Sequence, residues 1–260
     1  MTGPAGVMAL VLGETVAGGA VWLFLSPLWG EVKRGFFKLT GVVLFVLAVA
    51  GWRSVAAGLS VASDAGRWSL WLSGAVAALT LIWLVLLFAR ADGAARVLGF
   101  VSVPLCIAML AALAGTAEGS TTVAFLQLLA GAAFLGATLD GLLLGHWYLT
   151  DRGLSRKPID RSTIALMVGV GLEAAAIVTG GFGPTGASAD FNPLLTSAGL
   201  ASWIALGMVG ATALIAIMIR LVLKGARATA VQAATGFFYL AVITALTAEL
   251  AAKVRFLPPR

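Results

Sequence analysis

The sequence predicts an all-α fold, a polytopic bundle of about eight transmembrane helices. Of its 260 residues, 60% are hydrophobic and only 11% are charged, with a mean hydropathy of +1.03. An ordinary soluble domain carries about 25% charged residues. The 32 glycines, many of them inside apolar runs, are typical of membrane helices, in which glycine lets backbones approach closely. This composition excludes a soluble monomer.

Eight stretches are long and apolar enough to cross a membrane. A helix needs roughly 20 apolar residues to span a hydrocarbon core of ~30 Å, because lipid cannot satisfy backbone N–H and C=O groups. The stretches run approximately from Ala5 to Leu28, Phe36 to Ala57, Trp68 to Ala89, Ala94 to Gly115, Thr122 to Leu149, Ser162 to Phe182, Leu200 to Leu223 and Ala228 to Ala251. The connections are short, so we expect one transmembrane domain over residues 1–260.

The distribution of Lys and Arg predicts the orientation of the helices. Twelve of the 17 basic residues fall on one side of the predicted bundle and five on the other, and short positively charged loops stay in the cytoplasm. We therefore expect a multi-pass protein of a bacterial-type inner (plasma) membrane with both termini outside. The basic tail from Lys253 to Arg260 opposes this orientation. The net charge of +6 favours contact with anionic lipid over nucleic acid.

A faint internal duplication divides the chain into two halves. A shift of 123 residues aligns the first two predicted helices with the fifth and sixth without a gap and places Thr15 on Thr138. The halves would be 1–121 and 122–260, with a site expected at their interface. The alternative is chance similarity among Ala, Gly and Leu.

Four acidic residues lie within predicted helices, where an ionised group costs roughly 2.5–3.5 kcal/mol on insertion scales. Glu14 and Glu173 lie near the middle of the first and sixth helices, and Asp140 lies in the cytoplasmic half of the fifth. Glu249 lies near the outer end of the eighth and can reach Lys253 at i+4, which predicts an interfacial ion pair without a functional role.

Glycines four residues away place Glu14 and Glu173 on faces that pack against other helices. Gly18 follows Glu14 and Gly169 precedes Glu173 at this spacing, which corresponds to one face of a helix. Both carboxyls should therefore point into the bundle. Together with Asp140 they are the candidate proton carriers, and the alternative is a neutral acid hydrogen-bonded between helices.

The fifth helix carries a ladder of small residues and the single histidine. The small residues repeat at four-residue spacing, which predicts close helix contact, at Ala133, Ala137, Gly141 and Gly145. His146 follows Asp140 by six residues, about 120° around the axis, whereas Trp147 shares the face of Asp140. His146 could accept a proton at a quinone headgroup, ligate a haem by itself, or lie at the interface among aromatic residues.

The eighth helix adds a polar stripe that could complete a cytoplasmic-side pocket. Gln232, Thr235 and Tyr239 recur at i, i+3 and i+7. Arg220, near the cytoplasmic end of the seventh helix, either snorkels to the headgroups or neutralises Asp140. If these groups converge with His146 and Trp147, they form a quinone pocket or, less favoured, a haem pocket.

One Cys and one His exclude an internal disulfide, a Cys-based zinc site and a bis-histidine haem from this chain alone, and we predict no metal site. The leading hypothesis is an integral subunit of a respiratory or other energy-coupling complex, which contributes a quinone pocket or a proton path beside further subunits and lipid. The alternatives are a secondary transporter or channel, and a non-catalytic anchor or assembly subunit. Helix number and the glycine-rich first helix (Gly13, Gly18, Gly19) are similar to the membrane quinone subunits of molybdopterin oxidoreductase complexes.

The orientation can be tested with reporter fusions to the C-terminus. A periplasm-dependent reporter such as alkaline phosphatase should be active there, and a cytoplasm-dependent fluorescent protein should not, because the charge distribution places both termini outside. Fusions within the first cytoplasmic loop, which contains Lys33 and Arg34, should give the opposite result. A C-terminal fusion that is active only in the cytoplasm would overturn the orientation.

Overall fold

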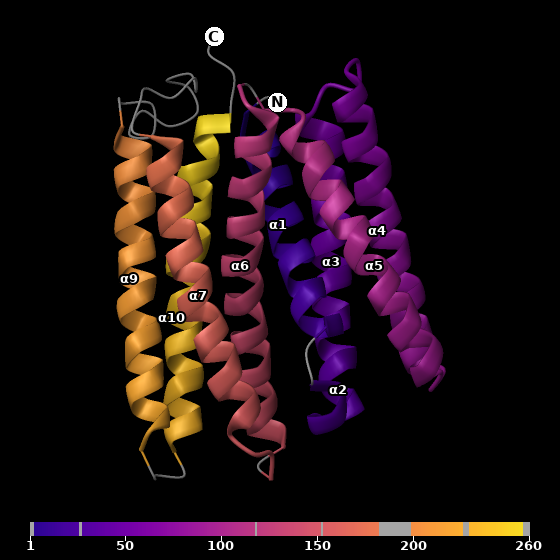
Figure 1. Cartoon of the computed structure of the whole chain (residues 1–260). Coiled ribbons are helices and arrows are strands. Elements are labelled where there is room, and N and C mark those ends of the chain that lie inside the picture. Colours follow the sequence, from indigo (N-terminus) through magenta and orange to yellow (C-terminus); the bar gives the residue numbers. More distant parts are fainter. Residues whose placement is uncertain are drawn as a thin grey trace.

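A computed structural model describes residues 3–25, 28–117, 119–151, 153–181, 199–225 and 229–256. Throughout these ranges the regular elements are helices, and no strand occurs (Figure 1). They are α1 (Gly3–Leu25), α2 (Leu28–Glu31), α3 (Arg34–Gly58), α4 (Asp64–Phe88), α5 (Asp92–Ala114), α6 (Thr121–Thr150), α7 (Lys157–Gly180), α9 (Leu200–Leu223), α10 (Ala230–Lys253) and the 3₁₀ helix η1 (Val254–Phe256). Eight of them are long and apolar enough to span a membrane. The all-α, multi-pass architecture is therefore confirmed.

Among the helix ends that differ from the sequence prediction, three have a clear cause or consequence. α1 ends at Leu25, ahead of Pro27 in the sequence, because proline disfavours continuation of a helix. α7 begins at Lys157, with Pro158 in its first turn, where proline is well tolerated. α10 continues to Lys253, so this lysine belongs to a membrane helix and not to an external tail. Most of the predicted loop from Gly183 to Gly199 lies outside the described residues.

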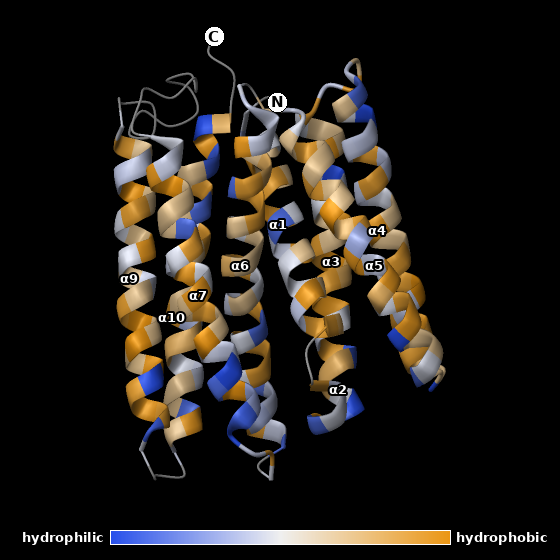
Figure 2. Cartoon of the chain, in the orientation of Figure 1, coloured by the Kyte–Doolittle hydropathy of each residue, from blue (hydrophilic) through white to orange (hydrophobic). Residues whose placement is uncertain are grey.

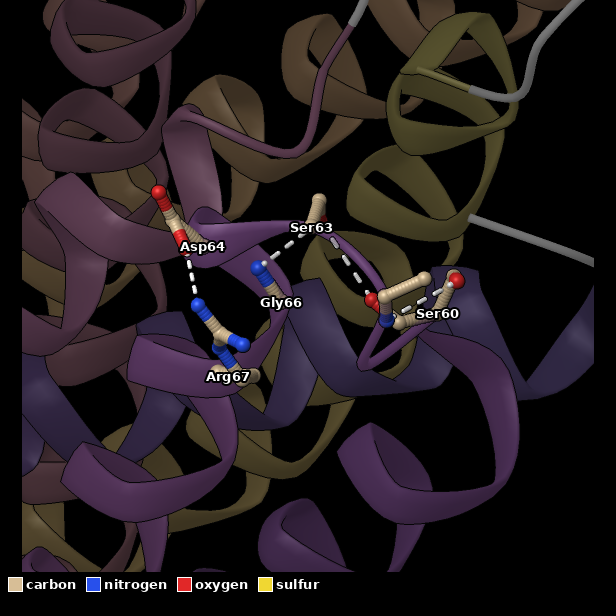
Figure 3. A network of polar contacts seen from close by, with 6 residues as sticks. Ser60, Ser63, Asp64, Gly66 and Arg67 are labelled. Carbon is tan, nitrogen blue, oxygen red and sulfur yellow. Dashed lines mark hydrogen bonds and ion pairs between the residues drawn. The ribbon is translucent and has the colours of Figure 1, made fainter.

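A serine cap begins α4 at the end of the bundle that holds both termini (Figure 3). The Ser63 hydroxyl accepts a hydrogen bond from the Gly66 N–H at 3.1 Å, which satisfies one of the free N–H groups of a helix start. The same hydroxyl donates to the carbonyl of Ser60. Asp64 pairs with Arg67 one turn later. These contacts fix the point where the chain re-enters the bundle.

The long helices form two groups of four that meet along α1 and α6 (Figure 1). In one group α1 packs against α3 and α5, and α4 packs against both α3 and α5. In the other, α6 packs against α7 and α10, and α9 packs against both α7 and α10. Each helix of the first group thus has a counterpart in the second, which supports the internal duplication as a proposal. Most residues of α1 are buried, whereas only a third of those in α9, at the edge, are buried.

Glycines make the contact between α1 and α6 possible. A Cβ atom added at Gly18 would lie 1.8 Å from the Ala132 carbonyl oxygen, and one at Gly136 would lie 2.3 Å from the Gly18 carbonyl carbon. Both distances are too short for any side chain, so the two backbones touch directly. The central seam of the protein therefore depends on two glycines.

The small-residue ladder of α6 contacts α10. A Cβ at Gly141 would lie 2.0 Å from the ring of Phe238, and one at Gly145 would lie 2.7 Å from the Thr235 hydroxyl. The close helix contact that the ladder predicts is confirmed, with α10 as the partner helix. Thr235 of the predicted polar stripe is consequently buried in this contact.

Hydrophilic residues gather at the two ends of the bundle and also occur inside the upper halves of α1, α7 and α10 (Figure 2). At the end away from the termini, two ion pairs connect the helix groups. Arg161 contacts Glu31 through both guanidinium NH₂ groups, at 2.7 and 3.0 Å, and Lys33 lies 3.0 Å from Asp151. The two groups are therefore tied together at this end by exposed or half-exposed charges.

Gly18→Ala should separate α1 from α6 and destabilise the bundle. Overpacking of a close contact costs about 1–3 kcal/mol, and here the atom that is struck is backbone and cannot rotate away. The thermal midpoint of the purified protein in detergent should fall. Gly207→Ala is the matched control, because a Cβ there meets nothing within 4 Å. Equal midpoints for the two variants would contradict the direct backbone contact.

Candidate functional site

Four charged side chains meet in the interior of the bundle, and we call them the carboxyl–lysine cluster: Glu14 of α1, Glu173 of α7, and Glu249 and Lys253 of α10. The Lys253 ammonium lies 2.8 Å from Glu14 Oε1 and 2.8 Å from Glu249 Oε2. Glu173 interacts with the charge of Lys253, and its carboxyl hydrogen-bonds with that of Glu249. Each of the four is at most 1% exposed. Glu14 and Glu173 thus point into the bundle, as their glycine-bearing faces predict.

The Glu249–Lys253 pair forms at the predicted i+4 spacing, but it is not interfacial. Both side chains are almost completely buried, and the lysine also binds Glu14 from another helix. The difference arises because α10 extends past Ala251, which carries Lys253 to the bundle interior. A pair that the sequence favours as structural is therefore the centre of the largest buried charge group among the described residues.

A glycine of α6 makes room for the Glu14 carboxyl. A Cβ added at Gly131 would lie 2.5 Å from Glu14 Oε1 and 2.7 Å from its carboxyl carbon. Because α6 has no side chain at this point, the carboxylate occupies the space between α1 and α10. The Glu14–Lys253 contact also joins the two helix groups, since α1 belongs to one and α10 to the other.

The charges of the cluster do not balance. Three carboxyls face one ammonium, and burying an uncompensated ion costs several kcal/mol. Glu173 Oε2 is buried and has no hydrogen-bond partner among the described residues. The cluster therefore requires a further positive charge or retained protons.

A cavity of about 240 Å³ reaches the cluster at the end of the bundle that holds the termini. Glu173 and Lys253 form part of its wall. Arg255 of η1 lines the same cavity and donates hydrogen bonds to the carbonyls of Ile177 and Gly180, near the C-terminus of α7. A cation is favoured there by the helix dipole. The cavity therefore lies between the buried cluster and this end of the bundle.

Asp140 forms a second, separate buried site. Its Oδ2 accepts a hydrogen bond from the Ser162 hydroxyl at 2.8 Å, between α6 and α7, and the residue is 4% exposed. Ser162 precedes Glu173 by eleven residues on α7, which corresponds to about 16 Å along the helix. Asp140 therefore does not contact the carboxyl–lysine cluster.

The predicted quinone or haem residues lie apart from both buried sites. Tyr239 places its hydroxyl 3.4 Å from His146 Nδ1, and this contact is exposed. Gln232, one of the stripe residues, is also exposed. Trp147 packs against Phe36 of α3, with ring centroids 6.4 Å apart, so it belongs to the seam between the helix groups.

One of the two sequence interpretations has Arg220 neutralise Asp140, and the structure shows a different partner for this arginine. Its Nη1 donates to Asp160 Oδ1 at 2.9 Å, because α7 begins early enough to carry Asp160 into its first turn. The predicted convergence forms only in part. His146 meets Tyr239 of the polar stripe, whereas Asp140 binds Ser162 and Arg220 binds Asp160.

Sequence reasoning missed three contributors to the site. The sequence places Lys253 and Arg255 in an external tail and gives no role to Gln127, which lines the cavity. The i+4 spacing predicts the Glu249–Lys253 pair but not its burial, because the predicted eighth helix ends at Ala251. The described residues contain no group of three or more His, Cys, Asp or Glu side chains arranged to hold a metal ion.

Comparison with known protein families, with curated proteins and with solved structures finds no match for this chain. The interpretation of the site therefore depends on its own geometry.

Lys253→Met should destabilise the protein strongly, because it leaves three buried carboxyls without their ammonium. Removal of one partner of a buried ion pair costs about 3–5 kcal/mol, and this should appear as a lower thermal midpoint in detergent. Lys224→Met, at an exposed position, is the matched control. Adding Glu249→Gln to Lys253→Met should recover part of the loss. No recovery, or no initial loss, would contradict the ion pairs described above.

Proposed function

We propose that this chain is an integral membrane subunit of an energy-coupling complex and moves protons through the carboxyl–lysine cluster. One observation carries the proposal. A buried cluster with more carboxyls than ammonium groups opens, through Glu173 and Lys253, onto a cavity at the membrane surface. Ionisable groups inside membrane bundles commonly mark ion or proton pathways.

Each cluster residue takes a definite part in this proposal. Glu173 exchanges protons with water in the cavity, because it lines the cavity and its Oε2 receives no hydrogen bond from a donor among the described residues. Glu14 and Glu249 hold the Lys253 ammonium at 2.8 Å each. The ammonium lowers the cost of a negative charge on Glu173 when the proton leaves.

Asp140 is the next proton carrier toward the opposite end in this proposal. The separation of about 16 Å along α7 exceeds direct transfer, so ordered water or a conformational step has to complete the path. Asp140 Oδ1 is buried without a hydrogen-bond partner among the described residues, which suits a group that takes up a proton.

The quinone part of the proposal rests on the contact between Tyr239 and His146. Their exposed hydroxyl and imidazole, 3.4 Å apart, could bind the carbonyl oxygens of a quinone headgroup from the lipid side. A Soret band in the absorbance spectrum of the purified protein would show a bound haem, and His146 would then be a haem ligand instead of part of a quinone site.

A secondary transporter is the second candidate, and the contact between the two helix groups favours it. Glu14 and Lys253 join the groups in the interior, while Arg161–Glu31 and Lys33–Asp151 join them at the other end. Transporters built from repeats move two such groups around a central site. Co-purification with redox subunits favours the complex, and solute uptake by the isolated protein favours the transporter.

Proton movement can be measured with the protein in liposomes that enclose a pH-sensitive dye. An imposed potential should drive proton flux through the unmodified protein, and Glu173→Gln should reduce it at least about tenfold, because an amide cannot exchange a proton at this position. Asp64→Asn is the control, since Asp64 is exposed at the same end of the bundle.

The assay should be repeated in the native membrane complex. If Glu14→Gln and Glu173→Gln both leave activity unchanged in the complex and in liposomes, the proton path is wrong.

A further inference from the structure

The cavity beside Glu173 offers more than a route for water. Its polar walls come from three parts of the chain: Ser120, which caps α6, and Gln127 of α6; Glu173 and Thr179 of α7; and Lys253 of α10 with Arg255 of η1. At about 240 Å³ it has room for a small solute as well as water. Its ligand preference follows from which of these groups already have partners.

The two cations in the wall are already paired with negative groups. Lys253 binds two carboxylates, and Arg255 binds two carbonyls near the C-terminus of α7. The Glu173 carboxyl also hydrogen-bonds with that of Glu249, but its buried Oε2 receives no hydrogen bond from a donor among the described residues. Gln127 uses its Nε2 on the Ala176 carbonyl at 3.2 Å, which leaves its Oε1 as an acceptor. The wall therefore keeps free acceptors at Glu173 Oε2 and Gln127 Oε1, beside the N–H groups that Lys253 and Arg255 do not use in these contacts.

The charge count around the cavity favours a cation over an anion as the ligand. Glu14, Glu173 and Glu249 supply three carboxylates, and Lys253 and Arg255 supply two cations. One negative charge remains when all five are ionised. A single monovalent cation balances it, and so does a single proton.

We infer that this cavity binds a small monovalent cation that carries N–H donors, namely ammonium or a primary alkylammonium such as methylammonium. Glu173 is the counter-ion, and Gln127 Oε1 accepts a second hydrogen bond. Phe256 adds an aromatic ring to the wall and already lies 5.6 Å from the Lys253 ammonium, and aromatic faces attract cations. The inference rests on the proposed role of Glu173 as the ionisable group of the cavity, but it does not require proton flux.

Two other classes of cation fit the cavity less well. A divalent metal needs several hard oxygen ligands, whereas Glu173 is the carboxyl that lines the described cavity wall, and its neighbours Lys253 and Arg255 repel a double charge. Tetramethylammonium has the right charge but no N–H group, so it leaves Glu173 Oε2 and Gln127 Oε1 without donors. The free acceptors therefore distinguish ammonium from its quaternary analogue.

Binding can be measured by isothermal titration calorimetry on the purified full-length chain in detergent, with methylammonium chloride as the ligand. Tetramethylammonium, sodium and potassium chlorides at equal ionic strength are the comparison ligands. Methylammonium should bind at one site, and the comparison ligands at least about tenfold more weakly. Glu173→Gln should weaken methylammonium binding about tenfold or more, because it removes a charge-assisted hydrogen bond.

Two further variants separate a local effect from misfolding. Gln127→Leu should weaken binding by a smaller factor, about three- to tenfold for one neutral hydrogen bond. Asp64→Asn, exposed at the same end of the bundle, should leave it unchanged. Binding that is equal for methylammonium and potassium, or that survives Glu173→Gln, would overturn the inference.

The same preparations distinguish this inference from the proposed function. Proton flux that depends on Glu173 without methylammonium binding refutes the cation site alone. Methylammonium binding that depends on Glu173 without proton flux refutes the proton path alone.

Discussion

The rest of this structure depends on one buried ammonium group. Lys253 lies within 2.8 Å of a carboxylate on its own helix and of another on α1, and it is 1% exposed. A charge this far from solvent is tolerated only when its partners are held in place. The positions of α1 and α10, and the space that α6 leaves between them, are therefore fixed by the need to keep Glu14 against Lys253.

Glycine provides that space at successive levels of α6. Gly131 accommodates the Glu14 carboxyl, Gly136 permits backbone contact with Gly18, and Gly141 admits the ring of Phe238. Neighbouring helices gain no hydrophobic driving force from apolar surface in lipid, so close packing and polar contacts hold them together. In this protein close packing and polar contact depend on each other, because the glycines that bring α1 against α6 also bring the Glu14 carboxyl to the Lys253 ammonium.

The two ends of the seam between the helix groups differ in how their charges are solvated. The Glu14–Lys253 contact is buried, whereas Arg161–Glu31 is partly exposed and Lys33 is largely exposed in its pair with Asp151. Exposed pairs contribute about 0–1 kcal/mol each and exchange readily with water. The interior contact cannot open without water or a ligand to replace each partner. The cavity beside Glu173 is the place in the described structure where that replacement would enter.

The sequence by itself determined the architecture and the burial of Glu14 and Glu173. Hydropathy determined the number of membrane helices, because lipid imposes length and composition on every spanning segment. Glycines at i±4 correctly oriented Glu14 and Glu173, because one helix face repeats at that spacing.

Only the tertiary structure decided which charges meet. Lys253 is a core residue because α10 extends past Ala251. Arg220 pairs with Asp160 instead of Asp140, and His146 contacts Tyr239 on the exposed face. These pairings join helices that are far apart in the sequence. Periodicity along one helix specifies a face, but it does not specify the neighbour that the face meets.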